Sequence, residues 1–315
     1  MGCRVKVAVF GVGSLGQWHA AKYDAMEEAE LVGVFDVDPA RAAEIAAKYN
    51  TRAFSDMEAL AEVADAASLV VPTHLHYDTF LTLAAHNLHL LVEKPIATTT
   101  EEAEEMVAVA RQKGLVLQVG HIERFNPVMR FLEDHMRTPT FIEAIRMCAY
   151  PPPRPGAAPR GTEVSVVLDM MIHDLELILH LVRSPLAEIR AFGVSVLSPS
   201  EDVADVRLRF ENGCVANLTA NRISTQQMRT ITVFQGDSYA ALDYGTQTGT
   251  LHRKGPDSMQ VVDIPTEKGD QLAHELRAFV HSAATRGEPV VTGEQGSQAL
   301  KLAVDICHII QTNPS

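Results

Sequence analysis

A glycine-rich hexapeptide near the N-terminus has the spacing of a turn that binds phosphate groups. Gly11, Gly13 and Gly16 follow the apolar run Val5–Phe10 and precede a helical pattern. In such a turn the glycines permit a tight bend and a close approach of pyrophosphate to the backbone N–H groups. Asp36 follows Gly16 by 20 residues, where a carboxylate can accept hydrogen bonds from ribose hydroxyls. The pattern predicts that a dinucleotide binds at Gly11, Gly13, Ser14, Leu15, Gly16 and Asp36.

Two other segments carry groups that could transfer a proton. Glu93-Lys94-Pro95 comes directly after an apolar run, and ligands bind at the carboxyl ends of parallel strands. Asp169 and His173 are one turn apart on a predicted helix, so that the carboxylate can orient the imidazole and tune its basicity. Taken alone, Lys94 could equally be a solvated surface charge.

The same predicted helix allows two other interpretations. At 100° per residue, four polar side chains fall within a stripe about 60° wide beside the apolar face: Asp169, His173, Glu176 and His180. Carboxylates and imidazoles in such a stripe could ligate a metal, or they could face solvent. We favour proton transfer and expect no stoichiometric metal.

Elements of two kinds are needed to position these groups. Up to Gly120, short apolar runs alternate with helical patterns, which predicts βαβ units and a parallel sheet. From Ala187 to Ile264 the pattern is extended with period-two alternation, and the Asn212-Gly213 turn predicts a hairpin. The sequence therefore predicts an α/β, doubly wound Rossmann domain at residues 1–120 and an α+β domain with a large, mostly antiparallel sheet at residues 121–315. The main predicted elements are strands Val5–Phe10, Leu31–Phe35, Ala67–Val71, Leu88–Val92, Leu115–Val119 and Val203–Phe210, and helices Thr100–Lys113, Val167–Arg183, Asp270–Thr285 and Gly293–Gln311.

Composition excludes several classes of protein. The 315 residues are 46% hydrophobic, enough for a sizeable core, and 27 basic against 40 acidic side chains give a formal charge of −13. Nucleic acids and anionic membranes are therefore poor partners, and no apolar run approaches the roughly 20 residues that cross a bilayer. The four cysteines are widely spaced, as in proteins with reduced thiols. We expect a soluble, cytoplasmic protein with a small-molecule substrate.

Together these motifs resemble the Gfo/Idh/MocA family of NAD(P)-dependent sugar and cyclitol oxidoreductases, over essentially the whole chain. The residues that carry the resemblance are the glycine turn, Val71-Pro72-Thr73 with His76, Glu93-Lys94-Pro95 and Asp169-x-x-x-His173-Asp174. The resemblance implies that Lys94 and His173 are the catalytic pair, with Asp169 assisting. It also implies that NAD lies along Pro72, Thr73, His76, Glu93 and Lys94. Glycine often occupies the middle of the D-x-x-x-H motif, where this chain has Met170-Met171-Ile172.

Within the family, the segment Gly120–Pro127 and the proline-rich stretch after Tyr150 resemble UDP-N-acetylglucosamine 3-dehydrogenases. The resemblance implies oxidation of the 3-hydroxyl of that nucleotide sugar to a ketone. The candidate substrate-binding residues are Arg124, Phe125, Asn126, Tyr150 and Arg160. Arg146, Arg154 and Arg160 could hold a diphosphate bidentately, or they could merely solvate a loop.

Other functions remain open at this stage. The enzyme could oxidise a free sugar or inositol, or it could be an NAD-dependent glycosidase. A non-enzymatic module that senses NAD is less compatible with the presence of Lys94, Asp169 and His173. Because a broad sheet usually needs covering, we expect a homo-oligomer formed through the C-terminal sheet.

We predict that the protein prefers NAD to NADP. The charge of Asp36 opposes the 2′-phosphate of NADP, although Arg41, a turn into the next helix, is a basic group that could favour it. Substitution Asp36→Ala or Asp36→Ser should bring the ratio of the NADP and NAD dissociation constants closer to one. Equal or tighter binding of NADP by the unaltered protein would show that the prediction is wrong.

Overall fold

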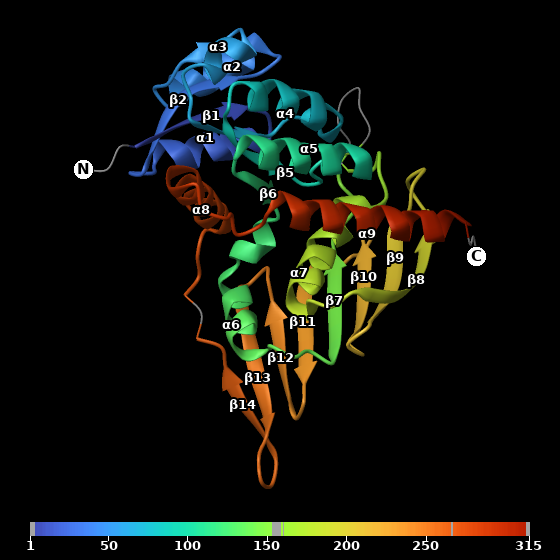
Figure 1. Ribbon diagram of the computed structural model, residues 1–315. Coiled ribbons are helices and arrows are strands. Elements are labelled where there is room, and N and C mark those ends of the chain that lie inside the picture. The colour runs from blue at the N-terminus through green and yellow to red at the C-terminus, as the bar shows by residue number, and fades with distance from the viewer. Residues whose placement is uncertain (1–3, 153–158, 160, 266, 313–315) are drawn as a thin grey trace. The chain divides into compact units, whose positions relative to one another are not determined.

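The computed structural model describes residues 4–152, 159, 161–265 and 267–312 (Figure 1). The chain divides into two compact units, each with its own core. The first unit contains the described residues up to Ile122 together with Asp270–Gln298. The second contains Glu123–Gly269 and the described residues from Ala299 onward.

The first unit is built on a six-stranded parallel sheet in the order β3-β2-β1-β4-β5-β6. Its strands are β1 (Val5–Phe10), β2 (Ala29–Phe35), β3 (Ala53–Phe54), β4 (Ala66–Leu69), β5 (His89–Glu93) and β6 (Leu117–Gly120). The order reverses between β1 and β4, the point at which a doubly wound sheet opens a ligand site. The predicted Rossmann fold is therefore confirmed, including β1 at the predicted bounds.

The helices that connect these strands are α1 (Gly16–Asp24), α2 (Pro39–Lys48), α3 (Met57–Ala61), the 3₁₀ turn η1 (Thr73–Leu75), α4 (His76–Ala85) and α5 (Thr100–Lys113). Three of them, α2, α3 and α5, begin at residues whose side chains cap their first turns. Asp38 accepts hydrogen bonds from two N–H groups of α2, and Thr99 forms a reciprocal capping box with Glu102 on α5. Gly114 ends α5 in the left-handed conformation. β3 and α3, which are very short, are not among the predicted elements.

Helix α8 (Gln271–Thr285) belongs to the first unit, although it follows the second sheet in sequence. It contacts α1 and β1, and α1 and α8 lie side by side in Figure 1. Its apolar side chains Leu276, Phe279 and Val280 are buried in the core of this unit. The structure thus corrects the predicted domain boundary: the first unit ends near the predicted residue 120, but it then regains a segment because its sheet face needs α8 as a cover.

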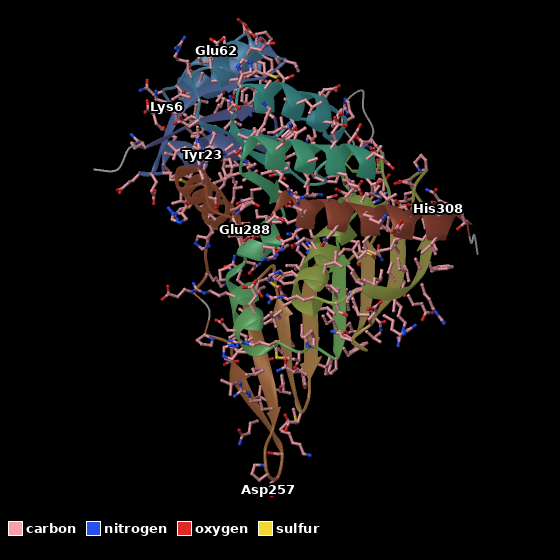
Figure 2. All side chains as sticks on the ribbon, in the orientation of Figure 1. Lys6, Tyr23, Glu62, Asp257, Glu288 and His308 are labelled. Carbon is pink, nitrogen blue, oxygen red and sulfur yellow. The ribbon has the colours of Figure 1, made fainter. Side chains whose placement is uncertain are left out.

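The second unit is built on an eight-stranded sheet in the order β14-β13-β12-β11-β7-β10-β9-β8. Its strands are β7 (Phe141–Met147), β8 (Leu186–Val194), β9 (Val203–Phe210), β10 (Val215–Asn221), β11 (Met228–Gln235), β12 (Ser238–Asp243), β13 (Thr248–Lys254) and β14 (Met259–Asp263). Only β7 and β10 pair in parallel, which confirms a mostly antiparallel sheet. Asp257 marks the tip of the β13–β14 hairpin (Figure 2).

One face of this sheet is covered by helices and forms the core of the unit. These elements are α6 (Pro127–His135), η3 (Val167–Met171), α7 (Ile172–Val182) and, from Ala299 onward, α9 (Gly293–Thr312); the turn η2 (Ile122–Phe125) precedes α6. Alternate strand side chains point to the covered face, as Ile142 and Ala144 do on β7. On the other face, Phe192 of β8 remains 49% exposed. Within the described residues, no helix is long and apolar enough to cross a membrane.

Buried ion pairs join η2, β7 and α7 inside the second unit. Arg146 on β7 donates from Nε and Nη2 to the carboxylate of Asp174 at 2.8 and 2.9 Å, and from Nη1 to Glu123 at 3.0 Å. Arg124 donates to Glu176 at 2.8 Å. These side chains are almost fully buried, so each charge depends on its partner for compensation.

The glycine turn provides a direct test of local packing. A Cβ at residue 16 would lie 1.8 Å from the carbonyl oxygen of Gly11, whereas a Cβ at residue 13 would meet nothing within 4 Å. We predict that Gly16→Ala lowers stability by about 1–3 kcal/mol or more, and that Gly13→Ala changes it by less than about 0.5 kcal/mol. Gly13→Ala should instead weaken NAD binding, because the methyl group occupies the approach of the pyrophosphate. Thermal denaturation and NAD titration of both variants separate the two effects.

The ion pairs of Arg146 predict a stability effect. Removing one member of a buried pair leaves the other charge uncompensated, so Arg146→Met should destabilise the protein by about 3–5 kcal/mol. Chemical denaturation measures this loss. Exposed Arg190, which pairs with Glu188 on the surface, supplies the control: Arg190→Met should cost less than about 1 kcal/mol. A folded Arg146→Met protein of normal stability would contradict the assignment.

Candidate active site

The glycine turn connects the end of β1 to α1. Gly11 has a φ of +86°, and a Cβ there would approach the backbone of Val70 to within 2.6 Å, so the turn requires glycine. Gly13 and Ser14 are exposed, and the space beside Gly13 is open. Backbone N–H groups at the start of α1 can therefore meet a pyrophosphate, and the residues fit the predicted dinucleotide.

Asp36, directly after β2, is held beside this turn. Its carboxylate accepts hydrogen bonds from the N–H groups of Val12 at 2.7 Å and Asp38 at 3.0 Å. Arg41 donates from Nε to the Val12 carbonyl at 2.9 Å and from Nη1 to Glu44 at 2.8 Å. The guanidinium that could have favoured a 2′-phosphate is thus engaged by other acceptors, while the Asp36 carboxylate lies beside the glycine turn.

His76 ties together the segments that follow β4 and β5. The ring is buried, with Nε2 2.9 Å from the Val71 carbonyl and Nδ1 3.0 Å from the Pro95 carbonyl. Burial lowers the pKa of His76, although the neighbouring carbonyls partly oppose this. These contacts make His76 a support for the Glu93-Lys94-Pro95 loop. Pro72 and Thr73, the other predicted cofactor contacts, lie at the start of η1 and retain exposure.

Glu93 points into the first unit. Its carboxylate lies 3.2 Å from Nε2 of His19 on α1 and accepts a hydrogen bond from the N–H of Lys94 at 3.3 Å. A Cβ on Gly120 would lie 2.9 Å from the same carboxylate, so Gly120 leaves the space that Glu93 occupies. Lys94 is half-buried at the carboxyl edge of the sheet, where the sequence places it.

The sequence interpretation missed two members of this cluster, His19 and Glu275. His19 is fully buried and lies three residues after Gly16, a spacing that could have placed it beneath the glycine turn. Glu275 on α8 is also fully buried, and its oxygens have no hydrogen-bond partner among the described residues. Burial, with the charge of Glu93 adding to it, raises the pKa of Glu275 well above its ordinary value.

In the second unit, Asp169 and His173 occupy an irregular helical start. Asp169 lies in η3, a π-helical segment, and His173 is in the first turn of α7. Both side chains are half-buried, whereas their neighbours Ile172 and Asp174 are buried. The predicted helix Val167–Arg183 is present, but it is not uniform: residues 167–171 form a wider turn, of a kind often found at functional sites.

The other members of the predicted polar stripe have protein partners. Glu176 is buried and paired with Arg124, and Nε2 of His180 lies 2.9 Å from Glu133. Burial raises the pKa of Glu176 despite the charge of Arg124. Among the described residues, no group of three or more histidine, cysteine or acidic side chains could hold a metal. The stripe thus divides into a half-buried pair and two residues that stabilise the core.

The predicted substrate-binding residues lie in different surroundings. Arg124, Phe125 and Asn126 are buried, and Asn126 caps α6 while donating to the Tyr244 carbonyl. Their burial suits support of the site better than contact with a substrate. Tyr150 is half-buried, with its hydroxyl 3.1 Å from Oγ of Ser198. Arg160 and Arg154 lie outside the described residues.

Arg146 requires a correction. The sequence suggests that it helps to hold a diphosphate, but the structure buries it against Asp174 and Glu123. Burial disfavours the charged guanidinium, yet the two carboxylates raise the pKa of Arg146 above its ordinary value. Its donors are engaged inside the core, so it cannot serve a diphosphate there.

Comparison with known proteins covers nearly the whole chain. The sequence profile described as "Oxidoreductase family, NAD-binding Rossmann fold" of the Gfo/Idh/MocA group matches residues 5–121. The Gfo/Idh/MocA C-terminal domain profile matches residues 138–238.

Individual relatives match over a similar extent. UDP-N-acetylglucosamine 3-dehydrogenase of Acidithiobacillus ferrooxidans is 33% identical over 96% of both chains. A crystal form of that enzyme superposes with a TM-score of 0.91 over 99% of both chains. Levoglucosan dehydrogenase in complex with NADH and levoglucosan, at 17% identity, shares the fold, with a TM-score of 0.88 over 98% of both chains. The chain therefore belongs to the Gfo/Idh/MocA family of oxidoreductases, whose N-terminal Rossmann domain binds NAD.

Proposed function

We propose that the protein is an NAD-dependent dehydrogenase that oxidises the 3-hydroxyl of UDP-N-acetylglucosamine to a ketone. The observation that carries this proposal is the full-length similarity to an enzyme of that name, at 33% identity. Other relatives are named for different substrates, so the substrate is the part of the proposal that most needs testing. Myo-inositol 2-dehydrogenase of Thermotoga maritima is 24% identical over 95% of this chain.

The proposed cofactor site uses the residues that surround the switch point of the first sheet. The N–H groups around Gly13 and Ser14 would receive the pyrophosphate, and Asp36 the ribose hydroxyls. Thr73 and Lys94, at the ends of the next two strands, would lie along the remainder of the cofactor. When bound, NAD accepts the hydride that leaves the carbinol carbon.

Three side chains would handle the hydroxyl proton and the charge on oxygen. His173 would take the proton as a general base, with Asp169 holding the imidazole in orientation. Lys94 would donate a hydrogen bond to the same oxygen and stabilise negative charge as it develops. Arg160 stays our candidate for the diphosphate of the substrate, and Tyr150 our candidate for the sugar.

The test is a rate comparison across substrates with purified protein and NAD. UDP-N-acetylglucosamine should be turned over faster than free N-acetylglucosamine, glucose or myo-inositol, and mass spectrometry should identify a 3-keto product. Arg160→Ala should raise KM for the nucleotide sugar without changing NAD affinity. Faster turnover of inositol or a free sugar would refute the assigned substrate. A product lacking its UDP group would instead indicate glycosidase chemistry.

We predict that Lys94→Met and His173→Asn each lower kcat by about 10²–10⁴-fold. NAD affinity of His173→Asn should be unchanged, because the residue lies in the second unit. His180→Asn serves as a matched histidine control, since His180 lies on the same helix as His173, pairs with Glu133 of α6 and has no proposed part in catalysis. If His173→Asn retains more than a tenth of wild-type turnover, another group is the base.

We also propose that the uncovered face of the second sheet associates with a second copy of the chain. Phe192 and Val194 on the edge strand β8 are large apolar side chains with 49% and 37% exposure. Light scattering should give the mass of an oligomer, and Phe192→Asp should lower that mass. A monomeric wild-type protein would contradict the proposal.

A further inference from the structure

A buried arginine follows β10 and contacts the segment that leads into η3. Arg222 is 1% exposed, and its Nε donates to Oδ1 of Asp202 at 2.8 Å. Nη1 donates to the carbonyls of Gly161 at 2.7 Å and Val164 at 2.9 Å, and Nη2 to Oγ of Ser200 at 3.0 Å. One guanidinium therefore joins β10, the loop between β8 and β9, and the approach to η3.

Asp202 has the complementary set of contacts. It is fully buried, and its Oδ2 accepts hydrogen bonds from three successive N–H groups at 2.6–2.9 Å, those of Val196, Leu197 and Ser198. Burial alone would raise the pKa of Asp202. The three N–H hydrogen bonds and the hydrogen bond from Arg222 outweigh this effect and hold the pKa well below its usual range. The pair thus remains charged inside the fold. It also orders the loop whose Ser198 contacts the hydroxyl of Tyr150.

Gly161 connects this ordered segment with the side chain of Asp169. It has a φ of +82°, and a Cβ at this position would lie 2.4 Å from Oδ2 of Asp169. The carboxylate of Asp169 is therefore packed against the backbone that Arg222 holds by its carbonyl oxygen. The next residues continue the link: Val166 donates its N–H to the Glu201 carbonyl, and the Asp169 N–H bonds to Ser165.

We propose that Arg222 and Asp202 are positioning residues for the reaction. They hold the 161–164 segment so that Gly161 sets the direction of the Asp169 carboxylate, and through the same loop they place Tyr150. This inference rests on the proposed role of Asp169 in orienting His173. It adds residues that lie outside the family motifs and that do not touch the reacting atoms.

Gly161→Ala tests the last contact without leaving a buried charge unpaired. The matched control is Gly213→Ala, because Gly213 has a similar φ of +88° and a Cβ there would meet nothing within 4 Å. Both substitutions carry similar backbone strain, and Gly161→Ala must in addition displace the Asp169 carboxylate, so its melting temperature should fall at least as far as that of Gly213→Ala. Only Gly161→Ala should lower kcat, by about 10²-fold if the carboxylate moves by about 1 Å. Its NAD dissociation constant should equal that of the wild type.

The pH profile supplies a readout that a purely structural role would leave unchanged. A displaced Asp169 stabilises the His173 imidazolium less, so the acid limb of kcat should move to lower pH in Gly161→Ala and stay in place in Gly213→Ala. Arg222→Lys should shift it in the same direction, because the three donors of a single ammonium cannot serve Asp202, the two carbonyls and Ser200 together, as the forked guanidinium does.

A double-mutant cycle separates this inference from the proposed function. In an Asp169→Ala background, Gly161→Ala should lower kcat no further, because the two changes act through one carboxylate. Additive losses, or a Gly161→Ala enzyme with wild-type kcat and pH profile beside an impaired Asp169→Ala enzyme, would overturn the inference alone. Wild-type turnover by Asp169→Ala would overturn the proposed role of Asp169, and this inference with it.

Discussion

A charge in the core of a protein is tolerated only where opposite charge and hydrogen bonds compensate its lost hydration. Among the described residues of the second unit, three buried arginines meet this constraint, in the pairs Arg146–Asp174, Arg124–Glu176 and Arg222–Asp202, and Arg146 pairs with Glu123 as well. The pairs Arg146–Asp174 and Arg124–Glu176 attach α7 to β7 and to η2. The pair Arg222–Asp202 restrains the segment that leads into η3, because Arg222 also donates to the carbonyls of Gly161 and Val164. The half-buried side chains Asp169 and His173 thereby lie on a helical stretch that is held at both ends, as a site that must orient two side chains requires.

In the first unit, the polar side chains are oriented less by ion pairs and more by close contacts with the backbone. Glycines at residues 11, 16 and 120 bring main chain or carboxylate into spaces that a methyl group would fill. His76 then connects the segments that follow β4 and β5, and His19 on α1 contacts Glu93 at the end of β5. Close packing explains why these positions matter: the polar groups at the sheet edge are aimed by backbone contacts, so their geometry depends on the absence of side chains as much as on their presence.

Local patterns were sufficient to predict most elements. The apolar run at Val5–Phe10, the capping box at Thr99 and the Asn212-Gly213 turn each specify structure within a few residues. What the sequence could not supply were pairings between distant segments. The burial of Arg146 depends on Asp174 and Glu123, and the place of α8 depends on the first sheet. Likewise, a π-helical turn has the composition of an ordinary helix, so Asp169 could be found by its motif but its angular position could not.

The return of the chain to the first unit has a consequence for how such a protein can be divided. Residues up to Ile122 lack the apolar face of α8, and α9 begins in one unit and ends in the other. A single cut or a single crossover between genes would therefore expose the side of a sheet or split a helix. The nucleotide-binding half is transferable only with α8 attached, for example through a circular permutation that joins residues 270–292 to the N-terminal residues. In this architecture, the transfer of a whole chain is therefore simpler than the transfer of one domain alone.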